Sequence, residues 1–326
     1  MFKMSRRGLA ALSAVAFAVA ALAAPQAQAQ NKPTIKVSSL TIPVFSPIVW
    51  NILKAQHFDE KNGFNLEIHP YPSISAYYAA FATGETDALF GGPTILQKLY
   101  LEGVPVRMFG TGLKLSDLAI FASNPAIKSL ADLKGKQLAI DMGGSQYQMV
   151  KIYANAKGID LGKDITTIQA NFPTARAQLE ASRVDAALVI EPLASLILKT
   201  HPDWKIIFNG ATGWKEITGE DGWEIVPAIR ADAIQKMPDA PKKLLAALQD
   251  VADFIVKDTA AADKIAHETT KLPPGVLKTA VDAKRWEFVV RPATGNDRKV
   301  LIDMMQRAVK AGFYSKMPDE KIIYAP

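Results

Sequence analysis

Two glycine-rich loops carry the residues best suited to hold a small ligand. One loop is Gly91-Gly92-Pro93-Thr94 and the other is Gly143-Gly144-Ser145-Gln146. Glycine lets a backbone approach a ligand closely, and a hydroxyl beside the free N–H groups of a helix start can hold an oxyanion without a formal positive charge. The same residues suit an ordinary helix start, in which Ser145 and Thr94 only cap their own helices. Both interpretations stay open, because a cap and a ligand contact can coexist.

Glu191 is the acidic residue that stands out. It follows the apolar run Ala186-Ala187-Leu188-Val189-Ile190, so we expect its side chain to be at least partly buried. A buried carboxylate needs a partner, which is either a cation or the amine of a ligand. Arg176 and Lys215 are the nearest cations by loop position. The structural pair is slightly favoured, and a ligand contact stays open.

Further candidates lie where other expected strands end, since the loops at the carboxyl ends of parallel strands face the ligand cleft. These candidates are Thr41, Pro43, Phe45, Phe172 and Trp214. The aromatic side chains expected at or just beyond such strand ends are Phe45, Tyr71, Tyr77, Tyr147, Phe172 and Trp214. If three of these six line the cleft, the ligand has an apolar or aromatic body. Few bases lie in the loops, which argues against a multiply charged ligand.

An internal repeat indicates how these loops are positioned. The segment 81–94 and the segment 179–192 both predict the end of a helix, a turn, an Asp, a short apolar strand and a Pro-marked helix start. The similarity extends upstream, where the strand-like residues 35–39 correspond to 137–141. A helix that closes on Gly63 likewise corresponds to one that closes on Gly158. Three correspondences at a near-constant offset predict two similar α/β lobes with a cleft between them.

Strand and helix patterns alternate from Thr34 to about Asn209, which predicts mainly parallel sheets with helical crossovers. From Ala231 onward the chain is helical, and we expect this part to pack back on the first lobe. The chain then crosses between the lobes near 116–120 and near 224–229. Pro227 favours an edge or crossing segment for the latter run. The expected division is residues 1–29 as a signal peptide, 30–117 and 227–326 as the first lobe, and 118–226 as the second lobe.

The first 29 residues have the features of a cleaved secretory signal. They combine a basic start, an apolar stretch from Leu9 to Ala24 and the small-residue pattern Ala27-Gln28-Ala29. Whether export follows the general or the twin-arginine route stays open. The chain has no cysteine, so we expect neither disulfides nor a lipid anchor. Without the signal's three bases the net charge falls from +6 to +3. Acids and bases are interleaved, which argues against nucleic-acid binding.

Several sequence motifs, taken in their order along the chain, resemble those of one protein family. The resemblance covers essentially the whole chain after the expected signal peptide. The segment Ser129-Leu130-Ala131-Asp132-Leu133-Lys134-Gly135-Lys136 resembles the opening of the second lobe in type II periplasmic solute-binding proteins. Residues 55–64 resemble the segment of those proteins in which a helix is followed by a Phe, charged residues and a Gly. Residues 83–88, 183–186 and Glu191-Pro192 are similar to motifs of the branch that binds nitrate, sulfonates, taurine and thiamine-pyrimidine precursors. This resemblance implies two sheets flanked by helices, a cleft between two lobes and two crossover segments.

The family implies a periplasmic receptor that delivers a small molecule to the permease of an ABC importer, and it implies a monomer. We expect a small organic acid, such as an alkyl or aryl sulfonate or a taurine-like compound. The runner-up is a pyrimidine or other aromatic heterocycle, with Glu191 taking its amino group, and nitrate comes third. A periplasmic enzyme on the same fold stays as an alternative of another class. Enzymes of similar fold depend on cysteine, and the chain has no hydrolase, zinc-protease or P-loop motif. We therefore expect no catalytic residue, no metal and no cofactor.

Overall fold

Two β-sheets form the frame of residues 32–326, the part of the chain that this computed structural model describes. The predicted signal peptide lies outside the described residues. The first sheet has the order β2-β1-β3-β11-β4, and the short β5 also pairs with β11. Its strands are β1 (Thr34–Leu40), β2 (Asn65–Tyr71), β3 (Ala88–Gly91), β4 (Val106–Met108), β5 (Leu113–Lys114) and β11 (Trp223–Arg230). The second sheet has the order β10-β6-β9-β7-β8. Its strands are β6 (Leu118–Ala122), β7 (Gln137–Ile140), β8 (Thr166–Gln169), β9 (Ala186–Ile190) and β10 (Lys205–Asn209).

The two sheets repeat one topology, as the internal sequence repeat predicts. Strands β1, β2, β3 and β4 occupy the positions that β7, β8, β9 and β10 occupy in the second sheet. The aspartates of the repeat even make the same contacts. Asp87 Oδ2 accepts from Lys36 N at 2.9 Å, and Asp185 Oδ2 accepts from Gln137 N at 2.8 Å. Each Asp therefore ties the start of its lobe's third strand to the start of its first.

One main strand in each sheet runs against the others, so both sheets are mixed. β11 is antiparallel to β3, β4 and β5, whereas β6 is antiparallel to β9 and β10. Each reversed strand is the one through which the chain enters that sheet after crossing from the other lobe. The predicted two-sheet α/β fold is confirmed. The mixed strand directions follow from the two crossings.

The expectation that residues 224–229 form an edge or crossing segment is wrong, because β11 lies inside the first sheet. Pro227 is tolerated there for a local reason. Its carbonyl accepts from Phe109 N at 3.2 Å, just beyond the end of β4. The N–H and C=O of a strand residue point to the same side, so the missing N–H faces this strand end and not β3. The second crossing therefore precedes Trp223, and the expected lobe boundary at 226/227 falls within β11.

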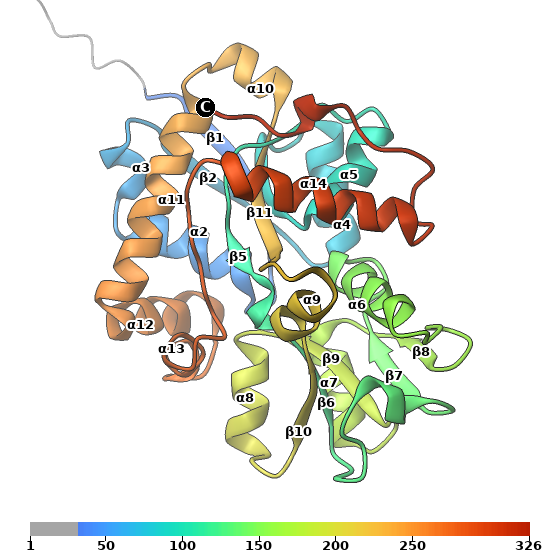
Figure 1. The fold of residues 1–326 in the computed structure, drawn as a ribbon. Coiled ribbons are helices and arrows are strands. Elements are labelled where there is room, and N and C mark those ends of the chain that lie inside the picture. The colour runs from blue at the N-terminus through green and yellow to red at the C-terminus, as the bar shows by residue number, and fades with distance from the viewer. Residues whose placement is uncertain (1–31) are drawn as a thin grey trace, which may run out of the picture. The chain divides into compact units, whose positions relative to one another are not determined.

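Helices cover both sheets (Figure 1). In the first lobe they are α2 (Phe45–Ala55), α3 (Phe58–Lys61), α4 (Ile74–Thr83), α5 (Pro93–Leu101), α10 (Ala231–Lys236), α11 (Ala240–Lys257), α12 (Thr259–Thr270), α13 (Val276–Asp282) and α14 (Gly295–Lys310). In the second lobe they are α6 (Ser145–Ala156), α7 (Phe172–Glu180), α8 (Leu193–Thr200) and α9 (Gly210–Thr218). Short 3-10 turns span Leu115–Asp117, Leu130–Leu133 and Glu320–Ile322.

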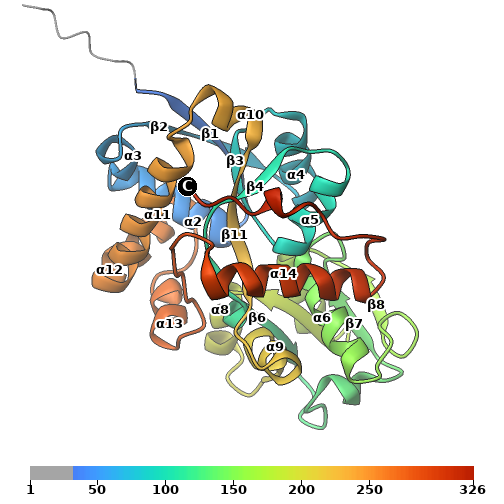
Figure 2. The ribbon, with the colours of Figure 1, turned by 45° about the horizontal axis from the view of Figure 1, so that its top comes forward.

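The C-terminal helices pack on the first lobe, as expected. α11 and α12 lie against α2. α14 lies against α5 and also reaches α6 of the second lobe, so it crosses the junction of the lobes (Figure 2). One hydrophobic cluster accordingly contains Leu96 of α5, Leu301 of α14, Met149 of α6 and Trp214 of α9. Burial of apolar surface thus joins the lobes in this structure.

A buried ion pair also ties the second sheet to the C-terminal helices. Glu191, directly after β9, is fully buried, and its Oε1 accepts from Arg285 Nε at 2.6 Å. Its Oε2 accepts from Ser195 N at 3.0 Å, and Arg285 Nη2 donates to Ser195 Oγ at 2.9 Å. Burial raises the pKa of Glu191 although Arg285 acts to lower it. The pair therefore joins two parts of the fold at a large desolvation cost.

We predict that Arg285→Ala destabilises the protein strongly at neutral pH. The change leaves a buried carboxylate without its cation, which costs about 3–5 kcal/mol of unfolding free energy. Without the guanidinium the pKa of Glu191 in the folded state rises further above its unfolded value. The variant's deficit is therefore largest at neutral pH and shrinks as the pH falls to about 4, where the side chain is protonated in both states.

Urea unfolding of both proteins at several pH values measures this difference. The control is Lys278→Ala on α13, which removes an exposed ion pair with Asp282. We expect that change to cost less than about 1 kcal/mol. Equal losses in the two variants would contradict the importance of the buried pair.

Candidate functional site

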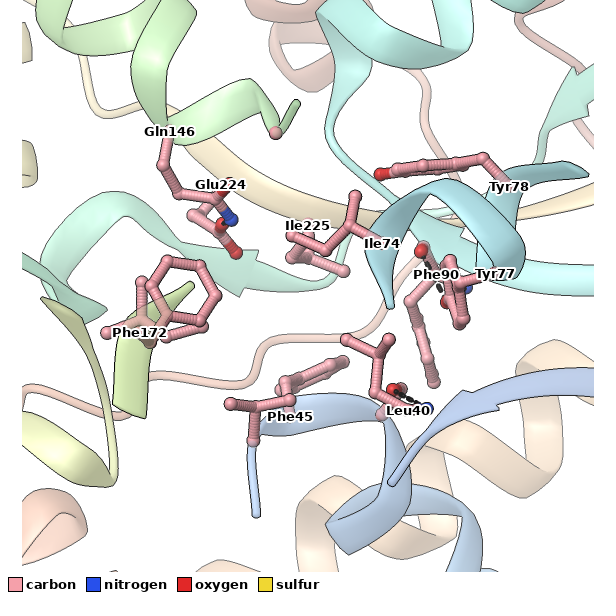
Figure 3. Close-up of a pocket in the computed structure, with 14 residues that line it drawn as sticks. Leu40, Phe45, Ile74, Tyr77, Tyr78, Phe90, Gln146, Phe172, Glu224 and Ile225 are labelled. Carbon is pink, nitrogen blue, oxygen red and sulfur yellow. Dashed lines mark hydrogen bonds between the residues drawn. The ribbon is translucent and has the colours of Figure 1, made fainter. Parts of the chain in front are cut away.

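A cavity of about 50 Å³ lies between the two lobes, and we call it the central pocket. The first lobe contributes most of its wall, and the second lobe contributes residues of α6, α7 and β9 (Figure 3). The lining residues are Leu40, Val44, Phe45, Ser46, Ile74, Tyr77, Tyr78, Phe90, Gly144, Gln146, Phe172, Ile190, Glu224 and Ile225. A pocket that needs both lobes can enclose a ligand only when the lobes lie close together.

Aromatic side chains make about half of the apolar wall. Phe45 begins α2 and meets Phe90 of β3 edge to face, with ring centroids 4.8 Å apart. Phe172 begins α7, where the side chain of Asn171 accepts from Thr174 N and caps the helix. Three of the six aromatic candidates, Phe45, Tyr77 and Phe172, therefore line the pocket. Such walls suit a ligand with an apolar or flat body.

Polar groups gather at one end of the pocket, where Glu224 of β11 meets Gln146 of α6 (Figure 3). Both side chains are buried, and Gln146 Nε2 donates to Glu224 Oε1 across the lobes. Neither Glu224 Oε2 nor Gln146 Oε1 has a hydrogen-bond partner among the described residues. Burial raises the pKa of Glu224 to about 8 despite the amide hydrogen bond. At neutral pH this end of the pocket therefore presents a neutral carboxyl and an amide, each with one oxygen that lacks a partner among the described residues.

A second carboxyl lies nearby at the first crossing. Asp117 is 1% exposed, and both of its carboxylate oxygens lack partners in the described part of the chain. Burial, followed by the charges of Glu224 and Glu191, raises the pKa of Asp117 well above its usual range. Within residues 32–326, no Lys, Arg or His lines the central pocket. The lining therefore offers a bound anion no opposite charge, and the two carboxyls are neutral at neutral pH.

The two glycine-rich loops meet across the junction. A Cβ built on Gly92 would lie 2.1 Å from Ser145 Oγ, so only glycine allows this contact between the starts of α5 and α6. A Cβ on Gly144 would lie 2.2 Å from Gln146 Oε1. Gly144 thus leaves room for the amide that reaches Glu224. In this structure the glycines allow close approach of one lobe to the other.

The structure brings some of the sequence candidates to the pocket and places others elsewhere. Phe45, Gly144, Gln146 and Phe172 line it. Gly92, Thr94 and Ser145 lie at the junction of α5 and α6, where the two hydroxyls are buried and have no partner among the described side chains. These hydroxyls do not cap their own helices, since no side-chain cap bond forms at either helix start.

The remaining candidates lie outside the pocket lining. Thr41 is exposed and Pro43 is half-buried. Trp214 packs in the hydrophobic cluster at the lobe junction, with Arg307 over its ring at 5.6 Å. The expectation that Arg176 or Lys215 pairs with Glu191 is wrong: they pair with Glu180 and Asp221 instead. Arg285 reaches Glu191 from a C-terminal segment that loop order does not bring near it.

Glu224 was missed by reasoning from the sequence. It begins the apolar run Glu224-Ile225-Val226-Pro227, so it shows the signal that drew attention to Glu191, an acid joined to a buried strand. Pro227, three residues later, favours an edge segment over a central strand for residues 224–229. The acid was therefore not assigned to a buried position.

A second cavity adjoins the central pocket. It also measures about 50 Å³ and shares Leu40, Ile74 and Phe172 with the pocket. Its other lining residues are Ile42, Pro72, Ser73, Asp141 and Asn171. These three shared side chains lie between the two spaces.

Sequence and structure comparisons place this architecture among known proteins. The family model described as NMT1/THI5 like matches residues 53–262. A candidate binding protein of Brucella abortus (strain 2308) is 22% identical over 220 residues, which are 68% of this chain and 66% of that protein. The match thus spans slightly less than two thirds of that relative.

Solved structures share the fold at low identity. The periplasmic aliphatic sulphonate binding protein SsuA from Escherichia coli has a TM-score of 0.75 at 17% identity, covering 90% of this chain and 92% of that one. The nitrate-binding protein NrtA from Synechocystis PCC 6803 has a TM-score of 0.69 at 17% identity, with 88% and 84% covered. These likenesses and the family match confirm the resemblance found in the sequence motifs. The chain belongs to the NMT1/THI5-like family and has the periplasmic binding protein fold.

Proposed function

We propose that the protein is an extracytoplasmic receptor that captures a small organic solute and delivers it to an ABC importer. The observation that carries this proposal is a pocket whose wall needs residues from both lobes. Two crossing segments join the lobes, which suits a hinge that opens and closes around a solute. The solved structures of this fold that bear functional names include sulfonate- and nitrate-binding proteins, which supports a receptor rather than an enzyme.

The pocket supports an aromatic or heterocyclic solute with a nitrogen donor better than a sulfonate, a taurine-like compound or nitrate. Its walls are largely apolar, and Glu224 Oε2 and Gln146 Oε1 are buried without a hydrogen-bond partner among the described residues. A sulfonate would add negative charge beside Glu224 and Asp117 without a cation to offset it. We propose that Glu224, and not Glu191, accepts a hydrogen bond from the amino group of the ligand. Both carboxylate oxygens of Glu191 already accept hydrogen bonds, from Arg285 and Ser195. Phe45, Phe172 and Gly144 complete the proposed contacts.

The proposed setting is the periplasm, with residues 1–29 acting as the export signal. In the portion described, 32–326, no helix is both long and apolar enough to cross a bilayer. We propose that the protein acts as a monomer and contacts the permease through the surfaces of its lobes.

A thermal-shift screen of the purified protein tests the receptor role. The panel contains sulfonates, taurine, nitrate, aromatic acids and aminopyrimidines. A solute at a hundred times its Kd adds about 2.7 kcal/mol to the stability of the folded state, so the midpoint rises measurably. We expect aminopyrimidines to raise it and sulfonates to leave it unchanged. A rise with sulfonates alone would reverse the proposed ligand class.

Gly92→Val tests whether closure is needed. Valine at this position collides with Ser145 across the lobes, so the variant should melt cooperatively but lose the solute-induced shift. Ala79→Val on the exposed face of α4 is the matched control and should keep the shift. Retention of the full shift in both variants would contradict closure at this contact.

We also predict that affinity for a neutral nitrogen donor rises with pH. The pKa of Glu224 in the empty pocket is about 8, and a bound donor favours the ionised carboxylate and lowers that pKa. Binding then releases a proton, so affinity should increase from about pH 6 to about pH 8 and level off above. Calorimetry across this range measures the trend, with Glu224→Gln as a flat and weaker reference. An affinity that falls with pH would indicate an anionic ligand bound to the protonated acid.

A further inference from the structure

We propose that the two residues Phe313 and Tyr314, which we call the clasp, hold α6 of the second lobe against the first lobe before any solute binds. The inference rests on the receptor role proposed above and goes beyond it, because it places a control of closure outside the central pocket. Neither the clasp nor its contact residues on α6 line that pocket.

The end of α14 fixes the position of the clasp. Gly312 has a φ of 81°, in the left-handed region that glycine adopts readily. Phe313 N then donates to Ala308 O at 3.0 Å, a bond typical of a Schellman helix end. Further along the chain, Tyr324 N donates to Met108 O of β4 at 2.7 Å. The clasp is therefore anchored to the first lobe on both of its sides.

A tyrosine–glutamine pair joins the clasp to α6. Gln148 Nε2 donates to Tyr314 Oη at 2.8 Å, and Tyr314 Oη donates to Gln148 Oε1 at 3.2 Å. A phenol hydroxyl can donate and accept at the same time, so one side chain satisfies both ends of the amide. Gln148 is buried, so water competes poorly for this amide while the lobes are together.

Aromatic and cationic contacts accompany this pair. The rings of Tyr147 and Phe313 lie edge to face, with centroids 6.3 Å apart. Lys151 Nζ lies 5.7 Å from the centroid of Phe313 and 6.0 Å from that of Tyr147. Tyr147 and Lys151 are four residues apart on α6, so they share one face of the helix. The two residues of the clasp therefore contact three residues of the second lobe.

Polar side chains of α5, which packs against both α6 and α14, make no comparable bond. Thr94 and Gln97 of α5, and Ser145 at the start of α6, have buried side-chain atoms without a partner among the described residues. Any of these groups that opening exposes gains hydrogen bonds to water, which favours the open form. The bond between Gln148 and Tyr314 acts in the opposite direction, because opening breaks it.

A contact made only in the closed arrangement shifts the equilibrium between open and closed protein by its own free energy. One uncharged hydrogen bond corresponds to about a fivefold change in that equilibrium. The clasp should therefore give the empty protein a substantial closed fraction. A solute then meets a partly preformed pocket, and its apparent affinity rises in proportion to the closed fraction.

Distances between spin labels in the empty protein test the inference. The chain has no cysteine, so Lys98→Cys in the first lobe and Lys134→Cys in the second lobe create two specific labelling sites, both exposed. Pulsed electron paramagnetic resonance then measures the distribution of label separations. We expect a closed population that matches the structure beside an open one. Tyr314→Phe should lower the ratio of closed to open protein about fivefold, because it removes the hydroxyl and keeps the ring.

Tyr153→Phe is the matched control, because it removes a tyrosine hydroxyl bond that stays inside one lobe. Tyr153 Oη donates to Glu216 Oε2 at 3.0 Å, and both residues belong to the second lobe. This change should lower the melting temperature without altering the label distances. Gln148→Met should act like Tyr314→Phe. The double variant should shift the populations no further than either single change, since all three proteins lack the same bond.

The outcomes separate the clasp from the receptor role. Equal distributions in the parent and Tyr314→Phe proteins, whether both are open or both are closed, would overturn the clasp. An equal redistribution in Tyr153→Phe would overturn it too. If Tyr314→Phe does not fold, Gln148→Met decides, and failure of both to fold would show that the contact supports the fold instead of controlling closure. None of these results affects the receptor role, which the absence of a shift with every solute of the screen would overturn.

Discussion

Three carboxyl groups are buried where the two lobes join, and only one of them has a cationic partner. Glu191 is paired with Arg285, whereas Asp117 and Glu224 have no ion-pair partner among the described residues. Buried charge is tolerated when it is paired, and otherwise the group takes up a proton. The junction therefore contains one permanent tie and two groups whose ionisation depends on what enters the pocket. The selectivity that we propose for the pocket follows from this difference.

The proposed receptor role requires the same junction to separate and close again, and two glycines allow its close contacts. Gly92 allows α5 of one lobe to touch Ser145 at the start of α6, and Gly144 leaves space for the amide of Gln146. Apolar packing around α14 contributes the stable part of the interface. The hydroxyls of Thr94 and Ser145 are buried there without partners among described residues, which lowers the cost of reopening to water. An interface of this composition suits reversible closure.

Local sequence patterns predicted the frame well, because the two lobes repeat one plan. The aspartates Asp87 and Asp185 mark the third strand of each lobe, and their contacts to Lys36 and Gln137 are the same in both. Helix starts marked by a glycine or by an Asn-Phe-Pro sequence could be predicted equally well. Pro227 was misleading, because a proline is excluded from a central strand only where its missing N–H would face a partner.

The sequence by itself determined the α/β class, the two lobes and the loops from which Phe45, Gly144, Gln146 and Phe172 reach the pocket. These features depend on hydrophobic period and turn chemistry within short segments. Only the tertiary structure decided which acid faces the pocket. Arg285 lies 94 residues from Glu191, and Gln146 lies 78 residues from Glu224. Such pairings arise when two lobes and the C-terminal helices pack together, and no local spacing in the chain encodes them.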